Sequence, residues 1–541
     1  MIQTRPTGAN RLVQFLTLGA ISISLCACSD TPDASTSPSA AIDDDLAWLS
    51  VAELQTRFAD DSLTSQTLVA SLIERIERLD DAGPTLNAVI AVNPDALSSA
   101  QKLDQERAQG QTRGPLHGIP VLLKANIDTG DRVPTSAGSL ALSDHIANDD
   151  ARLVADLRAA GLVILGKTNL SEWANFRSTE SVSGWSSVGG QTRNPHVIDR
   201  NACGSSSGSA AAVAAGFAPL AVGTETDGSI VCPSGVNGIV GIKPTLGLVS
   251  RDGIIPIAVS QDTAGPMARD VASAAALLAV LAQPDPADPA ADDHPGARNY
   301  AAPAQSPTTA GKRIGIWRGY YGSDGLPRVT AIVDRTAAAL RDLGADVIDP
   351  IDLTLPDGIG DAEYQVLLIE FRAGLNAYLA NTTLGADRNT LDALIAWNEA
   401  NAAATMPWFG QEIFIASAEA ADAGSPEHQV AIANSGVAMR AALDRLFDEL
   451  SLDAVIAPTN GPAWPIDSVQ GDRFSLSSSR LAAVSGWPSI TLPAGAVRGL
   501  PIGISIIGRR HSEPLLIGIA AELEAGSDAY RRPEFVPTLE P

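Results

Sequence analysis

Residues 202–209 read A-C-G-S-S-S-G-S, and the chain continues with A-A-A-V-A-A-G. Gly and Ser together are the usual composition of a flexible linker. The alanine-rich continuation instead predicts a helix that begins near Gly208. The serines would then lie at a helix N-terminus, where hydroxyls and unpaired backbone N–H groups gather. We therefore interpret this tract as part of a functional site rather than as a tether.

Composition narrows the class of protein. The chain has 541 residues, of which 45% are hydrophobic, so it can bury a large core. Its formal net charge is −25, which leaves no face basic enough to neutralise a phosphate backbone. We therefore expect no nucleic acid partner.

The N-terminal segment 1–27 has the features of an export signal. Arg5 and Arg11 precede an apolar run over 12–27 that is too short to span a bilayer comfortably. This pattern predicts a signal peptide and an exported protein.

The end of that run, L-C-A-C at 25–28, resembles a bacterial lipobox, in which Cys28 would be lipidated. By the same resemblance, Ser29 favours the outer membrane, with the protein facing the periplasm. Ordinary secretory cleavage after a small residue is the alternative. The lipid anchor would be the protein's membrane contact.

The polar, proline-broken segment 28–44 is predicted to be a flexible tether. Residues 45–532 have a mixed α/β pattern and are predicted to form one large domain, followed by a short tail at 533–541. Strand and helix candidates alternate along this domain. They predict an α/β fold with a mixed central β-sheet covered by helices on both sides.

Particular segments carry that prediction. Ser50 and Glu53 can form a capping box at the start of a helix. The segment 284–307, rich in Pro, Ala and Asp, is expected to be an exposed connection. Helices are expected at 68–79, 94–110, 149–160, 363–380 and 429–449, and strands at 86–92, 119–127, 162–166, 313–317, 345–350, 452–458 and 501–508.

One motif formally matches a nucleotide-binding pattern, but its surroundings in the sequence argue against that function. Residues 161–168, G-L-V-I-L-G-K-T, match the phosphate-loop pattern. A phosphate cradle needs a loop after its strand, whereas L-V-I-L is itself an apolar strand. We therefore predict no nucleotide cofactor.

Histidine-based and metal-based chemistry find little support. The chain has no G-x-S-x-G elbow, and His117, which precedes a strand, suits packing better than catalysis. No His or Cys pair stands at metal-ligand spacing. We predict neither a metal nor another cofactor.

Of the kinds of catalytic site considered, one that combines a lysine with serines remains. Residues 222–235 read V-G-T-E-T-D-G-S-I-V-C-P-S-G, an apolar strand that ends in a tight turn presenting Ser229. Backbone N–H groups of Thr226, Asp227 and Gly228 could converge there as an oxyanion hole. Lys124 ends another apolar strand.

At this point the chain resembles the amidase signature family. The resemblance is carried by L-L-K-A-N-I-D (122–128), the serine tract (203–216), G-T-E-T-D-G-S-I-V-C-P-S-G-V-N-G (223–238) and G-I-K-P-T-L-G-L-V-S (241–250). Together these motifs are specific, and the likeness extends over roughly 45–532. It implies the fold of that family and an amide-hydrolysing activity.

The resemblance also implies roles. Ser229 would be the nucleophile, Ser205 a bridging serine on a cis peptide bond, and Lys124 the base. Neutralising an ordinary lysine at pH 7 costs about 4–5 kcal/mol, so apolar surroundings must lower its pKa. The alternative is that Lys124 merely pairs with an acid.

The chain departs from the common family pattern at two places. Ala125 replaces the usual Asp after the lysine, and Val231 stands where many relatives carry Arg. Glu225 can replace the acid of an acid–arginine brace, but Val231 cannot replace the Arg. The bacterial peptide-amidase branch of the family shares these changes, which points to that branch.

Other assignments stay open. Cys203 and Cys232 could form a disulfide in an oxidising compartment or remain two buried thiols. Trp173, Trp464 and Trp487 could line the substrate site, although packing explains each of them too.

The predicted function is a serine amidase that hydrolyses a carboxamide through an acyl-enzyme, with the C-terminal amide of a peptide as the favoured substrate. Aryl or fatty acyl amides are an alternative substrate class. A lipoprotein that binds a ligand without turnover is the alternative from a different class.

Overall fold

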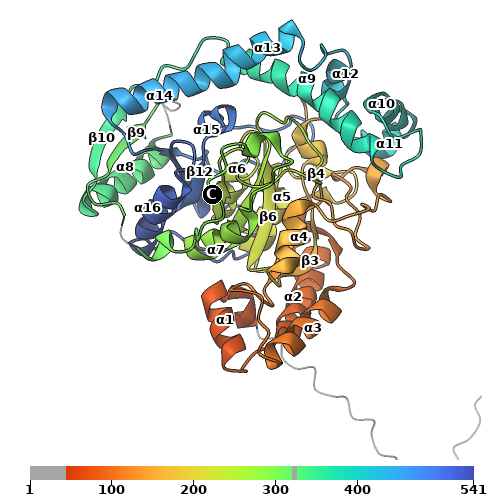
Figure 1. Ribbon diagram of the computed structural model, residues 1–541, viewed down its shortest axis with the longest axis horizontal. Coiled ribbons are helices and arrows are strands. Elements are labelled where there is room, and N and C mark those ends of the chain that lie inside the picture. The colour runs from red at the N-terminus through yellow and green to blue at the C-terminus, as the bar shows by residue number, and fades with distance from the viewer. Residues whose placement is uncertain (1–43, 307, 320–325, 541) are drawn as a thin grey trace, which may run out of the picture. The chain divides into compact units, whose positions relative to one another are not determined.

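A mixed β-sheet runs through the computed structural model, which describes residues 44–306, 308–319 and 326–540 (Figure 1). In the described residues the sheet has 11 strands in the order β1-β3-β2-β6-β8-β7-β12-β13-β11-β9-β10. The strands are β1 Val89–Val92, β2 Pro120–Lys124, β3 Val163–Thr168, β6 Leu220–Glu225, β7 Val240–Lys243, β8 Thr263–Ala268, β9 Arg313–Trp317, β10 Asp346–Ile351, β11 Ala454–Pro458, β12 Ser489–Val497 and β13 Leu500–Ile507. A separate hairpin joins β4 Trp185–Ser186 and β5 Gly190–Gln191.

Helices cover both faces of this sheet. α5 and α6 pack on one face, α7, α8 and α16 pack on the other, and α9, α13 and α14 form an outer row (Figure 1). The helices are α1 Val51–Ala59, α2 Ser65–Ile76, α3 Ala96–Ala108, α4 Arg152–Ala159, α5 Ser207–Ala214, α6 Val231–Asn237, α7 Val271–Leu281, α8 Pro327–Asp342, α9 Ile359–Ala380, α10 Leu391–Ala400, α11 Ala402–Thr405, α12 Glu412–Ala418, α13 Pro426–Ile432, α14 Ala438–Leu450, α15 Arg480–Ser485 and α16 Glu513–Ala525. The predicted fold class, one large α/β domain with a mixed sheet between helices, is confirmed.

Local chemistry explains where several elements begin. The capping box of Ser50 and Glu53 is present at the start of α1. β2 is buried along its whole length, as expected for a strand with parallel neighbours on both sides and helices on both faces. α5 starts at Ser207, so the alanine-rich run after the serine tract is a helix, as predicted.

Some expected boundaries were wrong. The strand expected over 119–127 ends at Lys124, because the backbone turns there and the Ile127 N–H donates to the Lys124 carbonyl at 3.0 Å. The helix expected over 429–449 is two helices, α13 and α14, joined by a π turn at Ala433–Val437. Strand β12 was not predicted.

The connection expected to be exposed at 284–307 was also partly wrong. Asp285 and Asp288 are buried and Tyr300 is only 1% exposed. Asp288 forms an ion pair with Arg251, and Asp285 accepts a hydrogen bond from the Ser250 hydroxyl at 2.5 Å. These acidic side chains attach the segment to the domain.

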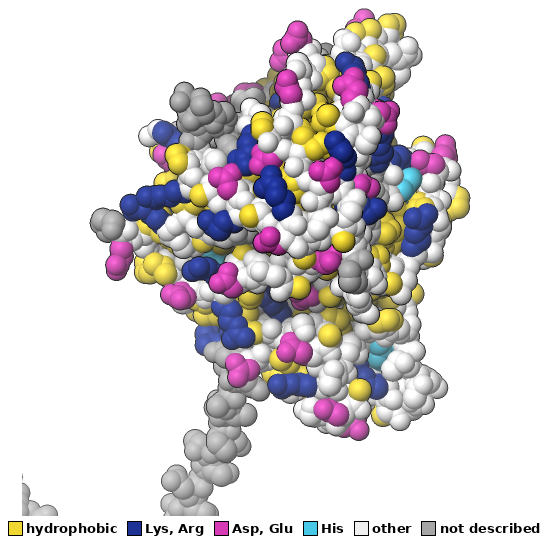
Figure 2. All heavy atoms as spheres, turned by 90° about the vertical axis from the view of Figure 1, so that its left-hand side faces the viewer, with side chains coloured by type: hydrophobic (Ala, Val, Ile, Leu, Met, Phe, Trp, Pro, Cys, Tyr) yellow, Lys and Arg dark blue, Asp and Glu magenta, His cyan; other side chains and the backbone are white. Residues whose placement is uncertain are grey.

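The signal segment 1–27, Cys28 and the tether before Asp44 lie outside the described residues. Among the residues that are described, no helix has the length and apolarity required to cross a bilayer. The face shown in Figure 2 carries acidic and basic side chains interspersed, without a large area of one sign. That face therefore offers no basic surface for nucleic acid.

Candidate active site

Two parallel strands place the predicted lysine and the predicted nucleophile at the same edge of the sheet. β2 ends at Lys124, and its neighbour β6 ends at Glu225, four residues before Ser229. The turn after β6 leads into α6, while the segment before α5 brings the serine tract to the same place. The Ser206 N–H donates to the Ser229 carbonyl at 3.1 Å, which ties these two segments together.

Lys124 is completely buried and touches hydroxyl groups. Its Nζ lies 2.8 Å from Ser205 Oγ, 2.8 Å from Thr224 Oγ1 and 3.2 Å from the Thr224 carbonyl oxygen. Burial lowers the pKa of Lys124 to about 7, although the negative charges of Asp262 and Glu225 oppose that change. No carboxylate forms an ion pair with this lysine within the described residues, so the alternative of a simple acid partner is not favoured.

Ser205 lies on the cis peptide bond that the resemblance implies. The bond joins Gly204 to Ser205, and both residues are buried. A Cβ on Gly204 would come within 2.2 Å of Ser171 Oγ, so glycine is the residue that fits here. The glycine before the bridging serine is therefore required by close packing.

Ser229 reaches a cavity of about 290 Å³. The residue is 8% exposed, and Thr226, Asp227 and Gly228 line the same cavity. Within the described residues, the backbone N–H groups of Asp227 and Gly228 donate to no protein acceptor. Donors left unpaired beside a nucleophile can stabilise a developing oxyanion.

Glu225 is braced without an arginine. Its Oε2 accepts the backbone N–H groups of Ile230 and Val231 at 2.7 and 2.9 Å. Burial raises the pKa of Glu225, whereas the charge of Lys243 lowers it. Glu225 thus holds the turn that presents Ser229, and the backbone of Val231 contributes to the brace although its side chain cannot.

Two further carboxyl groups, those of Glu363 and Asp227, lie next to each other at this turn. Burial and then the neighbouring charge of Asp227 raise the pKa of Glu363 to about 8. Glu363 also accepts hydrogen bonds from Gln261 Nε2 at 3.1 Å and from Arg480 Nε at 3.0 Å. A protonated Glu363 avoids the repulsion between its own negative charge and that of Asp227.

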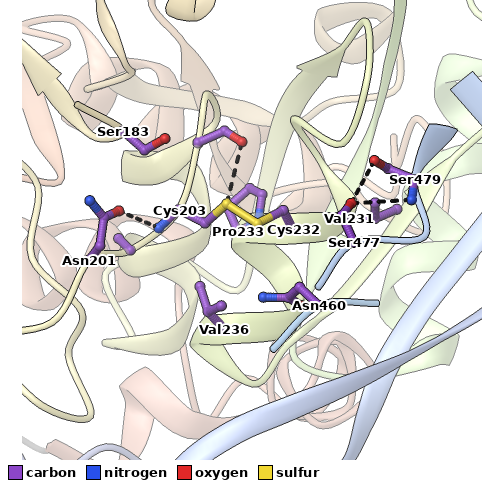
Figure 3. The surroundings of a disulfide bond; sticks show 12 residues. Ser183, Asn201, Cys203, Val231, Cys232, Pro233, Val236, Asn460, Ser477 and Ser479 are labelled. Atoms are coloured by element: carbon purple, nitrogen blue, oxygen red, sulfur yellow. Dashed lines mark hydrogen bonds between the residues drawn. A yellow bond between two sulfur atoms is a disulfide. The ribbon is translucent and has the colours of Figure 1, made fainter. Parts of the chain in front are cut away.

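Cys203 and Cys232 are disulfide-bonded, with their Cα atoms 6.0 Å apart (Figure 3). Both line the cavity that contains Ser229. The disulfide joins the residue two positions before Ser205 to the first turn of α6, which follows Ser229. Of the two alternatives left open by the sequence, the structure therefore has the bonded one.

The three tryptophans do not line this cavity. Trp173 packs edge-on against Phe414, and Trp487 packs against Phe447 in a different hydrophobic cluster. Trp464 packs at a tilt against Phe474, which is part of the cavity wall. Packing accounts for all three positions.

Several residues at the site were not predicted from the sequence. Thr224 holds Lys124, and Asn126 Nδ2 donates to Thr224 Oγ1 at 3.0 Å. Asn126 and Thr224 also line a second, larger cavity of about 410 Å³, which shares Thr226 with the first. Their proximity to Lys124 and to the serine turn in the sequence was the available signal. Glu363 and Phe474 carried no such signal.

No cluster of three or more His, Cys, Asp or Glu side chains suited to a metal ion occurs among the described residues.

Comparisons with known proteins show the family to which the chain belongs. The family model for amidases matches residues 67–517. The chain is similar to a "probable amidase" of Arabidopsis thaliana, with 38% identity over 90% of this chain and 91% of the relative. It is also similar to a glutamyl-tRNA(Gln) amidotransferase subunit of Moorella thermoacetica, with 33% identity over 90% of this chain and 98% of the relative.

Among solved structures, the native peptide amidase of Stenotrophomonas maltophilia is similar at 47% identity and a TM-score of 0.85, over 90% of this chain and 98% of that one. The family model alone covers well over half of the chain. The chain therefore belongs to the amidase family and is an amide-hydrolysing enzyme.

Proposed function

We propose that this enzyme is a serine amidase in which Ser229 forms an acyl-enzyme, Ser205 relays protons and Lys124 is the base. The observation that carries the proposal is the contact between Lys124 Nζ and Ser205 Oγ at 2.8 Å beside the cavity that Ser229 lines. A buried lysine with a pKa of about 7 is neutral in a large fraction of molecules at neutral pH.

The hydrogen bonds around Lys124 suit a base. A neutral amine has two hydrogens and one lone pair, and Nζ has three close oxygen neighbours. The Thr224 carbonyl oxygen can only accept, and Thr224 Oγ1 can accept the second hydrogen. The lone pair is then left for the proton of Ser205.

The proposed reaction uses these groups in turn. Ser205 passes its proton to Lys124 and takes the proton of Ser229, whose oxygen attacks the carboxamide carbon. The backbone N–H groups of Thr226, Asp227 and Gly228 stabilise the oxyanion. The proton returns through Ser205 to the leaving nitrogen, and ammonia departs. Water then attacks the acyl-enzyme. Ser205 and Lys124 take a proton from this water and return one to the Ser229 oxygen as the acid product leaves.

The substrate we favour is the C-terminal amide of a peptide. The 47% identity to a peptide amidase over nearly the whole of both chains supports this class. Aryl amides remain a second candidate, because the chain is also similar to a bacterial aryl acylamidase at 26% identity. A net charge of −25 disfavours charged transfer RNA, despite the similarity to the amidotransferase of Moorella thermoacetica.

The proposal is tested with N-acetylated dipeptide amides, free amides and anilides, with ammonia or aniline release as the measurement. We expect the peptide amides to give the highest kcat/KM. Hydroxylamine should divert the acyl-enzyme to a peptide hydroxamate. Faster turnover of anilides than of peptide amides would contradict the substrate assignment.

The nucleophile is tested separately. Ser229→Ala should lower kcat by about 10⁴-fold or more, because the loss of a nucleophile removes the covalent route. Ser477→Ala, at another serine in the same cavity wall, is the matched control and should keep most turnover. Hydroxamate formation by the Ser229→Ala enzyme would exclude Ser229 as the acylated residue.

We also propose that the enzyme is exported as a lipoprotein anchored through Cys28. Support comes from the charged start, the short apolar run and the lipobox-like L-C-A-C at 25–28. Mass spectrometry of the mature N-terminus tests this proposal. An acylated Cys28 is expected, and an unmodified N-terminus at another residue would contradict it.

A further inference from the structure

Phe474 is an exposed aromatic residue at the predicted reaction site. It is 55% exposed, whereas a large aromatic side chain usually contributes to a core or an interface. One side of it belongs to the cavity that contains Ser229, and it also lines a neighbouring cavity of about 360 Å³. Its ring therefore forms part of the wall that a bound substrate would meet.

The structure holds this ring in place. Phe474 packs against Trp464 with ring centroids 4.5 Å apart and the ring planes inclined by 50°. Trp464 Nε1 donates to the Asp472 carboxylate at 3.0 Å, and the same carboxylate accepts Asn201 Nδ2 at 3.1 Å and the Ser183 N–H at 2.9 Å. A side chain that is ordered before binding loses little entropy when a ligand packs on it.

The rest of the cavity wall indicates what would pack there. Phe176, Ile257 and Leu367 lie in the same wall, and Asp227 is the charged side chain among the lining residues. An apolar ligand group would bury this surface, and a charged one would lose its hydration without gaining a partner of opposite sign other than Asp227.

We propose that Phe474 is a specificity-determining residue, which packs against a large apolar side chain on the residue whose carboxamide is hydrolysed. This inference rests on the proposed function. It predicts a preference for substrates that end in an aromatic or large aliphatic amino acid amide over those that end in glycinamide.

The test compares ammonia release from N-acetyl-phenylalaninamide, N-acetyl-leucinamide and N-acetyl-glycinamide. In the Phe474→Ala enzyme, kcat/KM for the first two should fall by about 10- to 100-fold, mainly through KM, because a lost apolar contact weakens binding by this order. The loss for the glycinamide should be about three-fold or less. Phe474→Tyr should restore most of the preference.

Val469→Ala is the matched control, since Val469 lies on the same loop, is 87% exposed and is not part of either cavity wall. It should leave all three rates unchanged. Equal losses for all three substrates in Phe474→Ala, or a wild-type enzyme without preference, would overturn the role of Phe474 while the amidase function stands. A wild-type enzyme that releases ammonia from none of the three would overturn the peptide-amide function itself.

Discussion

Lys124 and Lys167 are two buried lysines in adjacent parallel strands, but only one of them is placed to act as a base. In the register of β2 and β3, Lys167 pairs with Leu123 and Lys124 pairs with Thr168. Successive residues of a strand point to opposite faces, so the two lysines leave the sheet on opposite sides. Both are completely buried.

Their surroundings differ in what they can exchange with an amine. Lys124 contacts two hydroxyls beside the cavity of Ser229. Lys167 donates to the Ile127 carbonyl and to Thr135 Oγ1, and the charge of Asp128 favours its protonated form. Burial lowers the pKa of Lys167 to about 8 and that of Lys124 to about 7.

Burial alone therefore does not make a lysine a base. The same desolvation acts on both side chains, and each amine has a hydroxyl partner, so the decisive difference is where that hydroxyl lies. Ser205, the partner of Lys124, follows Gly204 in the wall of the cavity that contains Ser229, whereas Thr135, the hydroxyl partner of Lys167, lines neither that cavity nor the larger one beside it. We interpret Lys124 as the base of the reaction and Lys167 as a residue that stabilises the fold. Four experiments test this distinction.

The largest effect is expected for Lys124→Met. Removing the proposed base should lower kcat by about 10³-fold, within the range found for general acid–base groups. Folding should be retained, because methionine fills the volume of the buried lysine stem and Asn126 still donates to Thr224 Oγ1. Ammonia release and circular dichroism are the measurements. Turnover within a few-fold of wild type would exclude Lys124 as the base.

Lys167→Met should instead reduce stability. The change removes the hydrogen bonds of a completely buried amine to the Ile127 carbonyl and to Thr135 Oγ1, and a buried polar group left without its partner costs about 1–3 kcal/mol of unfolding free energy. Turnover per folded molecule should stay within a few-fold of wild type. Denaturant unfolding and active-site titration separate the two quantities. A stable but inactive enzyme would contradict the structural role of Lys167.

The region around Lys124 also differs from that around Lys167 because it contains a disulfide. The Cys203–Cys232 bond joins the segment before Ser205 to the helix that follows Ser229. The bonded cysteines are 29 residues apart, and a closed loop of that size contributes about 3–4 kcal/mol on chain-entropy grounds. The double variant Cys203→Ala/Cys232→Ala should lose about this much unfolding free energy. Reductant should destabilise the wild type and leave the double variant unaffected. Equal stability with and without reductant would exclude a bracing role.

The smallest effect is the pH dependence. A lysine base must be neutral, so the active fraction falls tenfold for each pH unit below the pKa of Lys124, which is about 7. For an N-acetylated amide, kcat/KM should rise with pH up to about 7 and then level off. The Lys167→Met enzyme should show the same rise of kcat/KM with pH. A profile that is flat between pH 5 and 7 would contradict a titrating base.

Much of the fold was predictable because its elements carry local signals. β9 is predicted with its observed bounds, since R-I-G-I-W is a short apolar run that is buried in the sheet. The start of α5 follows from the alanines after the serine tract. β12 was missed: its second half carries Pro493 and Gly495, which weaken the strand pattern, and pairing with β7 and β13 stabilises it.

The candidate site divides in the same way. Lys124, Ser205 and Ser229 were named from motifs, because each stands in a short stretch of characteristic composition. Thr224, Glu363 and Phe474 were not named, because their contacts reach across the fold. Glu363 comes from α9 and meets Asp227 more than 100 residues earlier in the chain.

The sequence by itself determined the family, the α/β class and the residue types that the chemistry requires, since all of these are local patterns along the chain. The tertiary structure decided which of the buried lysines meets a serine, that the two cysteines bond, and that Phe474 stands exposed at the cavity of Ser229. These outcomes depend on strand register and on long-range packing. Both are set by the burial of many side chains at once, which no short segment records.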